Sequence, residues 1–162
     1  MDYSVEVVEL PEQPYVAMEV VCSPEEFAFE VEKTATAVWG LLGDSGIAPA
    51  GPPFCLVPQI TTTDDEVPPP SPWQLIVGFP VEDELEAEDP ILFGHLAGGK
   101  VLTTLHMGKL DTLSTAYLAL QVHMMKEGLT PVGAPWEVYL SDPAWEPDPE
   151  QWRTVVNWAV EG

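Results

Sequence analysis

The sequence predicts an α+β domain made of two β-α-β-β repeats related by pseudo-two-fold symmetry, with an antiparallel sheet, two main helices and a central cleft. One observation is a duplicated turn before a strand, because Gly51-Pro52-Pro53-Phe54 has a counterpart in Gly133-Ala134-Pro135-Trp136. A second is that each half ends in a similar apolar run, at residues 76–81 and again at 155–160. One repeat alone would leave a sheet face bare, so we expect the two repeats to pair and bury it.

Length and composition are consistent with a single domain over residues 1–162. The hydrophobic fraction is 46%, which is typical of a globular chain with a real core. We place repeat one at about residues 4–81 and repeat two at about residues 91–161. Residues 82–90 between them carry a dense run of acids and predict a solvated linker.

The first repeat opens with residues 4–22, which predict one long strand, or two strands interrupted near Pro11 and Pro14. Ser23-Pro24-Glu25-Glu26 is a good helix start, because Ser can cap, Pro suits the first helical position and Glu completes a capping box. The helix then follows an apolar stripe and ends at two glycines: Phe27, Val31, Ala35, Val38 and Leu42, then Gly43 and Gly46. Further strands are expected at 54–57 and 73–81.

The second repeat shows the same order of elements. Residues 95–106 predict a strand with a bend at Gly98-Gly99. A second apolar stripe at helical spacing is closed by Gly128: Leu110, Leu113, Tyr117, Leu120 and Met124. Strands at 136–140 and 155–160 complete the repeat.

The charge of the chain restricts its partners. The sequence has 27 acids against five Lys and Arg, a formal net charge of −22. Such a surface repels phosphate, so we expect no direct nucleic-acid binding, and it favours cationic ligands or basic protein patches. No apolar run reaches the length of a membrane span and the first residues lack the features of a signal peptide, so we expect a cytoplasmic protein without membrane association.

No pattern for a metal or a cofactor is found. Cys22 and Cys55 fit a reduced setting and lack metal-ligand spacing, although a disulfide between them stays open. His95, His106 and His123 do not cluster and are expected to be structural. No glycine loop that could cradle a phosphate is present, so we predict neither a cofactor nor a metal.

The strand at 136–140 carries a carboxylate among apolar residues. Side chains alternate along a strand, so Glu137 and Tyr139 share one face, while Trp136 lies on the other and is expected to pack under a helix. A buried carboxylate without a partner is costly. This face therefore either turns to water or lines a pocket.

The repeat makes Glu137 more informative. The counterparts of Glu137 and Tyr139 in repeat one are Cys55 and Val57, which are apolar. If the two units face each other, the asymmetry places one charge in an otherwise apolar groove. This pattern favours a functional role for Glu137.

With the repeat laid out, the chain resembles the GyrI-like effector-binding family, whose members are tandem β-α-β-β units also called paired SHS2 modules. The residues that carry the resemblance cover nearly the whole chain: Gly51-Pro52-Pro53, Gly98-Gly99, His106-Met107-Gly108, Leu113, Ala116-Tyr117, the run from Gly133 to Leu140, and Asp142-Pro143. The Glu-x-Tyr-Leu-x-Asp-Pro run is the most specific of these. The chain departs at Lys109-Leu110, where the family usually has Pro-Tyr on one aromatic wall of its cleft.

The resemblance implies a free-standing binder of lipophilic, cationic or aromatic drug-like compounds, with Glu137 at the floor of a cleft among aromatic rings. The family also includes effector-binding domains of bacterial transcription activators, inhibitors of DNA gyrase and hydrolases of cyclopropane-bearing genotoxins. Three functions therefore stay open: small-molecule binding, hydrolysis with Glu137 and Tyr139 as catalytic residues, and binding of a basic protein such as gyrase. A homodimer also stays open.

Six residues are candidates for ligand binding: Glu137, Tyr139, Trp39, Phe79, Trp158 and Cys55. Glu137 would attract a cation that the rings support by cation-π contact, and Tyr139 would bond to the ligand or hold Glu137. Phe79 and Trp158 are repeat partners that either wall the cleft or belong to the core. Trp39 either leans into the groove between the helices or is partly buried, and Trp145 and Trp152 are candidates for a lid.

Overall fold

A computed structural model of the chain describes residues 3–60, 69–70, 72–84, 91–141 and 147–162. In this part of the chain, strands and two long helices follow one another in the predicted β-α-β-β order in each half, so the predicted α+β class is confirmed. The first half contains β1 (Glu6–Leu10), β2 (Gln13–Cys22), α1 (Phe27–Asp44), β3 (Phe54–Leu56) and β4 (Trp73–Pro80). The second half contains β5 (Ile91–Leu96), β6 (Gly99–Met107), α2 (Ser114–Glu127), β7 (Thr130–Pro131), β8 (Trp136–Tyr139) and β9 (Arg153–Glu161).

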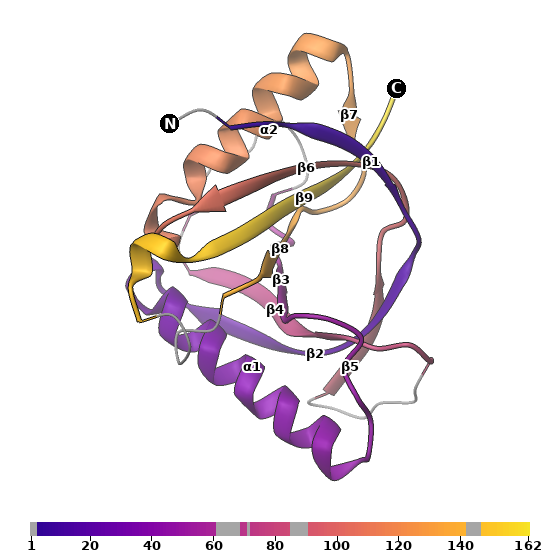
Figure 1. Cartoon of the computed structure of the whole chain (residues 1–162), viewed down its shortest axis with the longest axis vertical. Helices are drawn as coiled ribbons and strands as arrows, with labels where there is room; N and C mark the ends of the chain where they lie inside the picture. The colour runs from indigo at the N-terminus through magenta and orange to yellow at the C-terminus, as the bar shows by residue number, and fades with distance from the viewer. Residues whose placement is uncertain (1–2, 61–68, 71, 85–90, 142–146) are drawn as a thin grey trace.

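The sheet shows the two-fold relation directly. Its antiparallel strands run in the order β1-β6-β9-β8-β3-β4-β2-β5, and the short β7 pairs with β9 outside this path. Reading outward from the centre, β8-β9-β6 on one side corresponds to β3-β4-β2 on the other (Figure 1). The pseudo-two-fold axis therefore passes between β3 and β8, where Cys55 lies opposite Glu137. The two positions matched in the sequence are thus strand-pairing partners.

The outermost strands are exchanged between the halves. β1 leads into β2 but pairs with β6, and β5 leads into β6 but pairs with β2. The predicted break near Pro11 is present, but the one near Pro14 is not, because β2 runs through Pro14. The two crossing segments touch at this break and at the predicted bend, because a Cβ on Gly98 would lie 2.5 Å from the backbone nitrogen of Glu12. Only glycine fits such a close approach of two backbones. We call β1 and β5 the exchanged arms.

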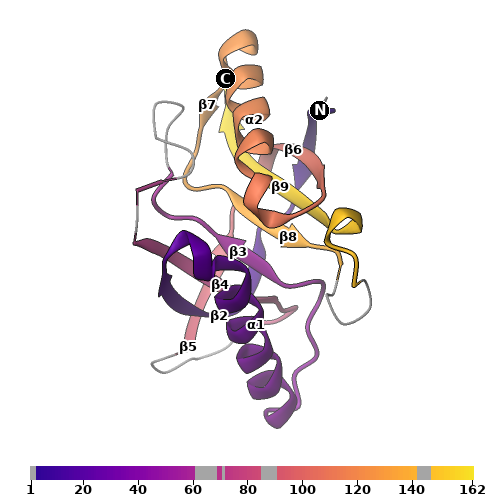
Figure 2. The ribbon, with the colours of Figure 1, turned by 90° about the vertical axis from the view of Figure 1, so that its left-hand side faces the viewer.

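Both helices lie over the same face of the sheet, α2 over one half and α1 over the other (Figure 2). The predicted capping box is present just before α1: Glu26 Oε1 accepts the Ser23 backbone N–H over 3.3 Å, and the Ser23 hydroxyl also donates to it over 2.9 Å. α2 ends as predicted at Gly128, which is left-handed with φ 69°. Neither helix has the length and apolar character needed to cross a membrane, within the residues described.

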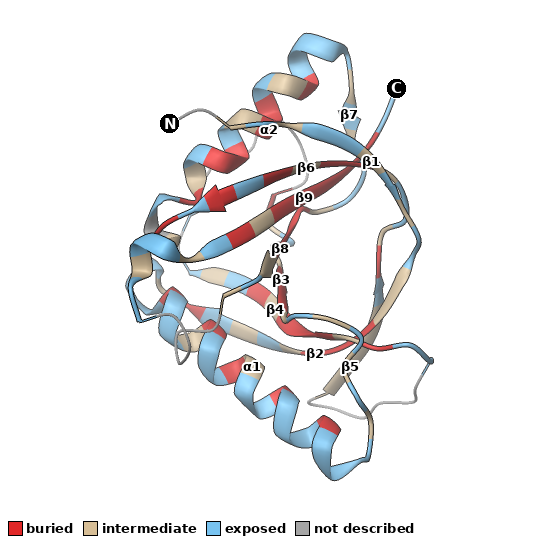
Figure 3. Cartoon of the chain, viewed as in Figure 1, coloured by how far each residue is buried: buried red, intermediate tan, exposed pale blue. Residues whose placement is uncertain are grey.

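Buried residues occupy both faces of the sheet (Figure 3). A first cluster lies between the helices and the sheet centre and includes Cys55, Tyr117 and Trp158. A second lies on the opposite face and consists of strand and bend residues, Trp136 and Phe54 among them. The expectation that Trp136 packs under a helix is therefore wrong. The repeats join edge to edge through β3 and β8, and the face without helices is covered by the curved sheet itself.

Candidate functional site

A cavity of about 340 Å³ lies between the N-terminal ends of α1 and α2, on the helical face of the sheet. Its position between the halves agrees with the predicted central cleft. Most of its lining is apolar or aromatic, and its two acids are Glu25 and Glu137. The other lining residues are Pro24, Phe27, Ala28, Val57, Ile60, Pro69, Trp73, Leu75, Leu110, Leu113, Ser114 and Tyr117.

Glu137 reaches this cavity from the centre of the sheet. Its strand, β8, lies between β3 and β9, so Glu137 has Cys55 on one side and Val156 on the other. Both neighbours are completely buried, and Glu137 itself is only 3% exposed. The strand alternation predicted from the sequence is correct, because Glu137 faces the helices and Trp136 faces away.

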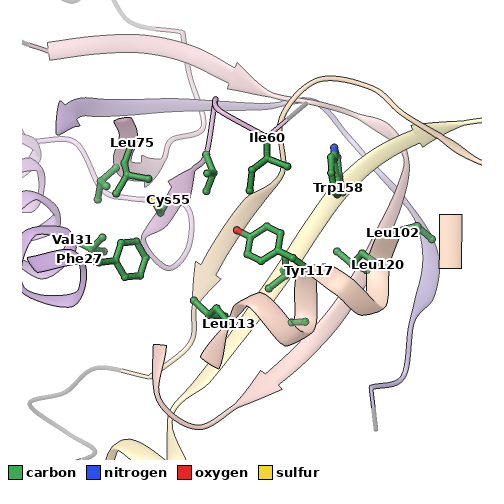
Figure 4. Packing of buried hydrophobic residues seen from close by; sticks show 14 of the residues in the cluster. Phe27, Val31, Cys55, Ile60, Leu75, Leu102, Leu113, Tyr117, Leu120 and Trp158 are labelled. Atoms are coloured by element: carbon green, nitrogen blue, oxygen red, sulfur yellow. The ribbon is translucent and has the colours of Figure 1, made fainter. Parts of the chain in front are cut away.

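Two tyrosines hold the carboxylate from different elements. Tyr117 on α2 donates its hydroxyl proton to Glu137 Oε2, and Tyr139 on β8 donates to Glu137 Oε1 over 2.6 Å. Figure 4 shows the Tyr117 ring leaving α2 with its oxygen directed toward the half that carries Cys55 and Phe27. Each carboxylate oxygen therefore accepts one phenol hydrogen bond, and the two bonds together hold the carboxylate group in one orientation.

These contacts also set the protonation of the group. Burial raises the pKa of Glu137, and the hydrogen bonds from Tyr117 and Tyr139 oppose this by lowering it. Burial, and after it the charge of Glu137, raises the pKa of Tyr117 well above 10. Burial, then the neighbouring Cys55 and Glu137, raises the pKa of Tyr139 in the same direction. Both phenols thus stay protonated and can act only as donors to the carboxylate.

No cation of the protein neutralises Glu137 among the residues described. The ion pairs found there join His95 to Glu12 and Glu84, and Lys109 to Glu150. The same residues contain no cluster of His, Cys, Asp and Glu that could hold a metal. The carboxylate is therefore hydrogen-bonded without a counter-charge from these residues.

The aromatic residues predicted as walls lie elsewhere. Trp39 is 56% exposed and packs on Phe79, with ring centroids 5.5 Å apart, near the far end of α1. Trp158 is fully buried and donates its indole N–H to the Gly133 carbonyl over 3.0 Å. None of the three lines the cavity.

Cys55 lies beneath the site and not on its wall. Burial, with the charge of Glu137 as a second cause, raises the pKa of its thiol well above 9, so the thiol is not a ready nucleophile. Cys22 and Cys55 are both free, which resolves the disulfide that the sequence left open. The ligand-binding roles predicted for Glu137, Tyr139 and Cys55 remain predictions.

Sequence reasoning missed Tyr117 as a site residue. Its spacing predicts only a member of the buried helical stripe, which it also is. The signal was its polarity, because a phenol in the middle of an apolar stripe needs a partner for its hydroxyl. Leu110, where the sequence departs from the family that it resembles, lines the cavity as an aliphatic residue. The Asp142-Pro143 part of the motif and Trp145 of the suggested lid lie outside the described residues.

Comparisons with protein-family models and with curated proteins give no match. Solved structures do match. The EcmrR C-terminal domain is 19% identical with a TM-score of 0.79, and the alignment covers 99% of both chains. The chain therefore shares the fold of the EcmrR C-terminal domain. In the EcmrR–DNA complex the match has 20% identity and a TM-score of 0.78, covers 98% of this chain, and spans only 57% of the EcmrR chain.

Two further matches are described with a ligand or an activity. SAV2435 bound to tetraphenylphosphonium is 13% identical with a TM-score of 0.55, over 100% of this chain and 95% of that one. A hydrolase from Listeria innocua is 14% identical with a TM-score of 0.62, over 97% and 91% of the two chains. At these identities the similarity is one of fold.

Proposed function

We propose that this protein binds lipophilic organic cations in the cavity between the two helices, with Glu137 as the counter-charge. The observation that carries the proposal is a carboxylate, 3% exposed, that lies on a mostly apolar cavity and accepts two phenol hydrogen bonds. A buried charge of this kind is strongly stabilised by an opposite charge brought by a ligand.

The surroundings favour a bulky aromatic cation. Phe27, Trp73 and Tyr117 present rings to the cavity, and a cation within about 6 Å of such a ring gains cation-π attraction. Glu25, exposed in the turn just before α1, adds a second negative group at the cavity. The net charge of −22 raises the local concentration of cations around the whole molecule.

The fold comparisons support the same ligand class. SAV2435, which shares the fold, is described in complex with tetraphenylphosphonium, a lipophilic cation without hydrogen-bond donors. Such a ligand can be held only by charge and by apolar contact. The cavity here offers both, through Glu137 and its apolar lining.

Calorimetric titration with tetraphenylphosphonium tests the proposal. Glu137→Gln keeps the size of the side chain and removes its charge, so we expect affinity to fall by roughly ten- to a hundredfold, as for loss of one charged interaction. Glu25→Gln is the matched control, which removes an exposed charge at the same cavity and should change affinity by about threefold or less. Triphenylphosphine oxide, a neutral analogue, should not distinguish Glu137→Gln from the wild type. Equal tetraphenylphosphonium affinity in wild type and Glu137→Gln would refute the anchoring role.

A second candidate is hydrolysis of a strained electrophile such as a cyclopropane-bearing alkylator. It is favoured by the raised pKa of Glu137, because a carboxyl group that titrates closer to neutral pH is better suited to general acid–base work, with Tyr139 assisting. Product analysis by mass spectrometry distinguishes turnover from binding. A product that forms no faster than in buffer, or equally fast with Glu137→Gln, removes the enzymatic role. Binding of a basic protein such as gyrase stays a prediction from charge alone.

A further inference from the structure

A second cavity lies on the opposite face of the sheet, away from both helices. Its volume is about 210 Å³, and it is bounded by the central strands β3 and β8 and by the segments where the exchanged arms cross. In Figure 1 this is the side on which the exchanged arms bow away from β3 and β8. Every lining residue is uncharged: Leu10, Pro11, Gln13, Pro52, Phe54, Pro80, Leu96, Ala97, Trp136, Val138 and Asn157.

Asn157 is the feature that the fold does not explain. It lies on β9 between Thr103 and Trp136, is 7% exposed, and lines this cavity. No group of the described residues forms a hydrogen bond with its carboxamide, and its polar atoms are not sealed from the cavity. An amide without a hydrogen-bond partner in an apolar setting costs folding free energy. A partner supplied from outside the chain would remove that cost.

The two-fold counterpart of Asn157 shows that the carboxamide is not needed by the scaffold. In repeat one this position is Gly78, where a Cβ would lie 2.0 Å from the Val16 carbonyl oxygen. The first half is therefore closed to any side chain at this point. Only the second half leaves space above the strand, and that space is where the carboxamide lies.

Gln13 supplies a second amide to the same cavity. Its Nε2 donates to the Pro14 carbonyl over 3.1 Å and to the Val81 carbonyl over 2.7 Å. Both donor hydrogens are thereby used, and the orientation of the amide is fixed. Its Oε1 remains as an acceptor. The cavity thus offers one acceptor from Gln13 and both a donor and an acceptor from Asn157.

We propose that this second cavity binds a small neutral aromatic carboxamide. The rings of Phe54 and Trp136 and the aliphatic lining suit an aromatic ring, and an apolar cavity of about 150 Å³ is already large enough for benzene. A ligand amide N–H can donate to Gln13 Oε1 or Asn157 Oδ1, while its carbonyl accepts from Asn157 Nδ2. Anions are disfavoured by the net charge of −22, and cations find no counter-charge on this lining.

Binding of benzamide, followed by two-dimensional NMR of the ¹⁵N-labelled protein, tests this site. We expect a Kd of about 1 mM or lower, with shifts at the Trp136 indole and the Asn157 amide. Asn157→Leu keeps the approximate size and removes the carboxamide, so it should weaken benzamide at least tenfold and leave toluene within about threefold. Ala97→Phe fills the cavity from a bend and should abolish binding of both compounds.

The possible results separate cleanly. Absence of shifts with benzamide, shifts confined to Tyr117 and Leu113 of the other cavity, or equal benzamide affinity in Asn157→Leu would each overturn the proposal. Should Asn157→Leu fail to fold, Ala97→Phe decides alone, because unchanged benzamide affinity in that variant also overturns it. Titration of Asn157→Leu with tetraphenylphosphonium reports on the first cavity alone. A failure of the proposed cation site can therefore be told apart from a failure of the proposed carboxamide site.

Discussion

The two halves of the molecule differ most where the pseudo-two-fold axis crosses the sheet. Repeat two places Tyr117, Glu137 and Tyr139 there, joined by hydrogen bonds. Repeat one places Val31, Cys55 and Val57 at the matching positions of the helix stripe and the strand: buried residues without ionised groups.

The comparison teaches that the scaffold does not require a polar group at this point. Half of the structure folds around the same axis with apolar side chains, and does so at lower cost, because a buried carboxylate must be compensated. The polar trio is therefore explained by function more readily than by stability. Four predictions test this contrast.

Placing a glutamate in repeat one, at the position that matches Glu137, should have the largest effect on stability. Cys55→Glu places a second carboxylate directly opposite Glu137 in the strand pair, where two buried like charges repel. We expect a loss of about 3–5 kcal/mol in the free energy of unfolding at pH 7, measured by urea denaturation. The loss should shrink as pH falls and one carboxylate takes a proton. Cys55→Val is the control, and a loss under about 1 kcal/mol for Cys55→Glu would contradict the contrast.

Removing the Tyr117 hydroxyl, so that repeat two becomes apolar there like repeat one, should have a smaller effect on stability. Tyr117→Phe removes one of the two donors to a buried carboxylate, so we expect a loss of about 1–3 kcal/mol in the free energy of unfolding. Tyr15→Phe is the control, since Tyr15 is also buried but its hydroxyl forms no hydrogen bond with the described residues, and it should cost about 0.5 kcal/mol or less. Equal losses in the two variants would show that the Tyr117 hydroxyl does not hold Glu137.

The pH dependence of Glu137 should act in opposite directions on stability and on binding. Its pKa in the folded state lies above the unfolded value of about 4.3, so the folded state holds its proton longer and gains stability at low pH. That gain is lost as pH rises through the folded pKa, by at most about 1.4 kcal/mol per pH unit for one proton. Over the same range, affinity for tetraphenylphosphonium should increase because the carboxylate forms.

The check is a pair of pH series with Glu137→Gln as reference. The stability of wild type relative to Glu137→Gln should decrease with rising pH, while cation affinity of wild type alone should increase. Stability and affinity that rise together would mean that another group dominates the titration.

The smallest effect is expected at Trp39. Its exposed ring packs on Phe79 away from the cavity, so Trp39→Ala should leave tetraphenylphosphonium affinity within about twofold and cost at most about 0.5–1.5 kcal/mol of stability from the lost aromatic pair. The measurement is the same titration, with thermal denaturation beside it. A tenfold loss of affinity would instead place Trp39 in the ligand site, as one interpretation of the sequence had it.

Much of this architecture was determined by local sequence patterns. The capping box at Ser23, the glycine end of α2, the chain breaks at Pro11 and Gly98, and the face chosen by Glu137 all depend on neighbouring residues, and all were predicted. The sequence repeat also accounts for the strand pairing of Cys55 with Glu137. A two-fold axis between matching strands places matching residues opposite each other.

Only the tertiary structure decided which side chains meet. Tyr117 reaches Glu137 across the space between a helix and a strand, while Trp39 and Phe79 find each other instead of the cavity. The exchange of β1 and β5 between the halves also encloses Trp136 and Asn157 on a face without helices. The physical reason is that turns, caps and strand alternation depend on residues close in sequence, whereas these contacts depend on packing between segments far apart in the chain, which periodicity does not encode.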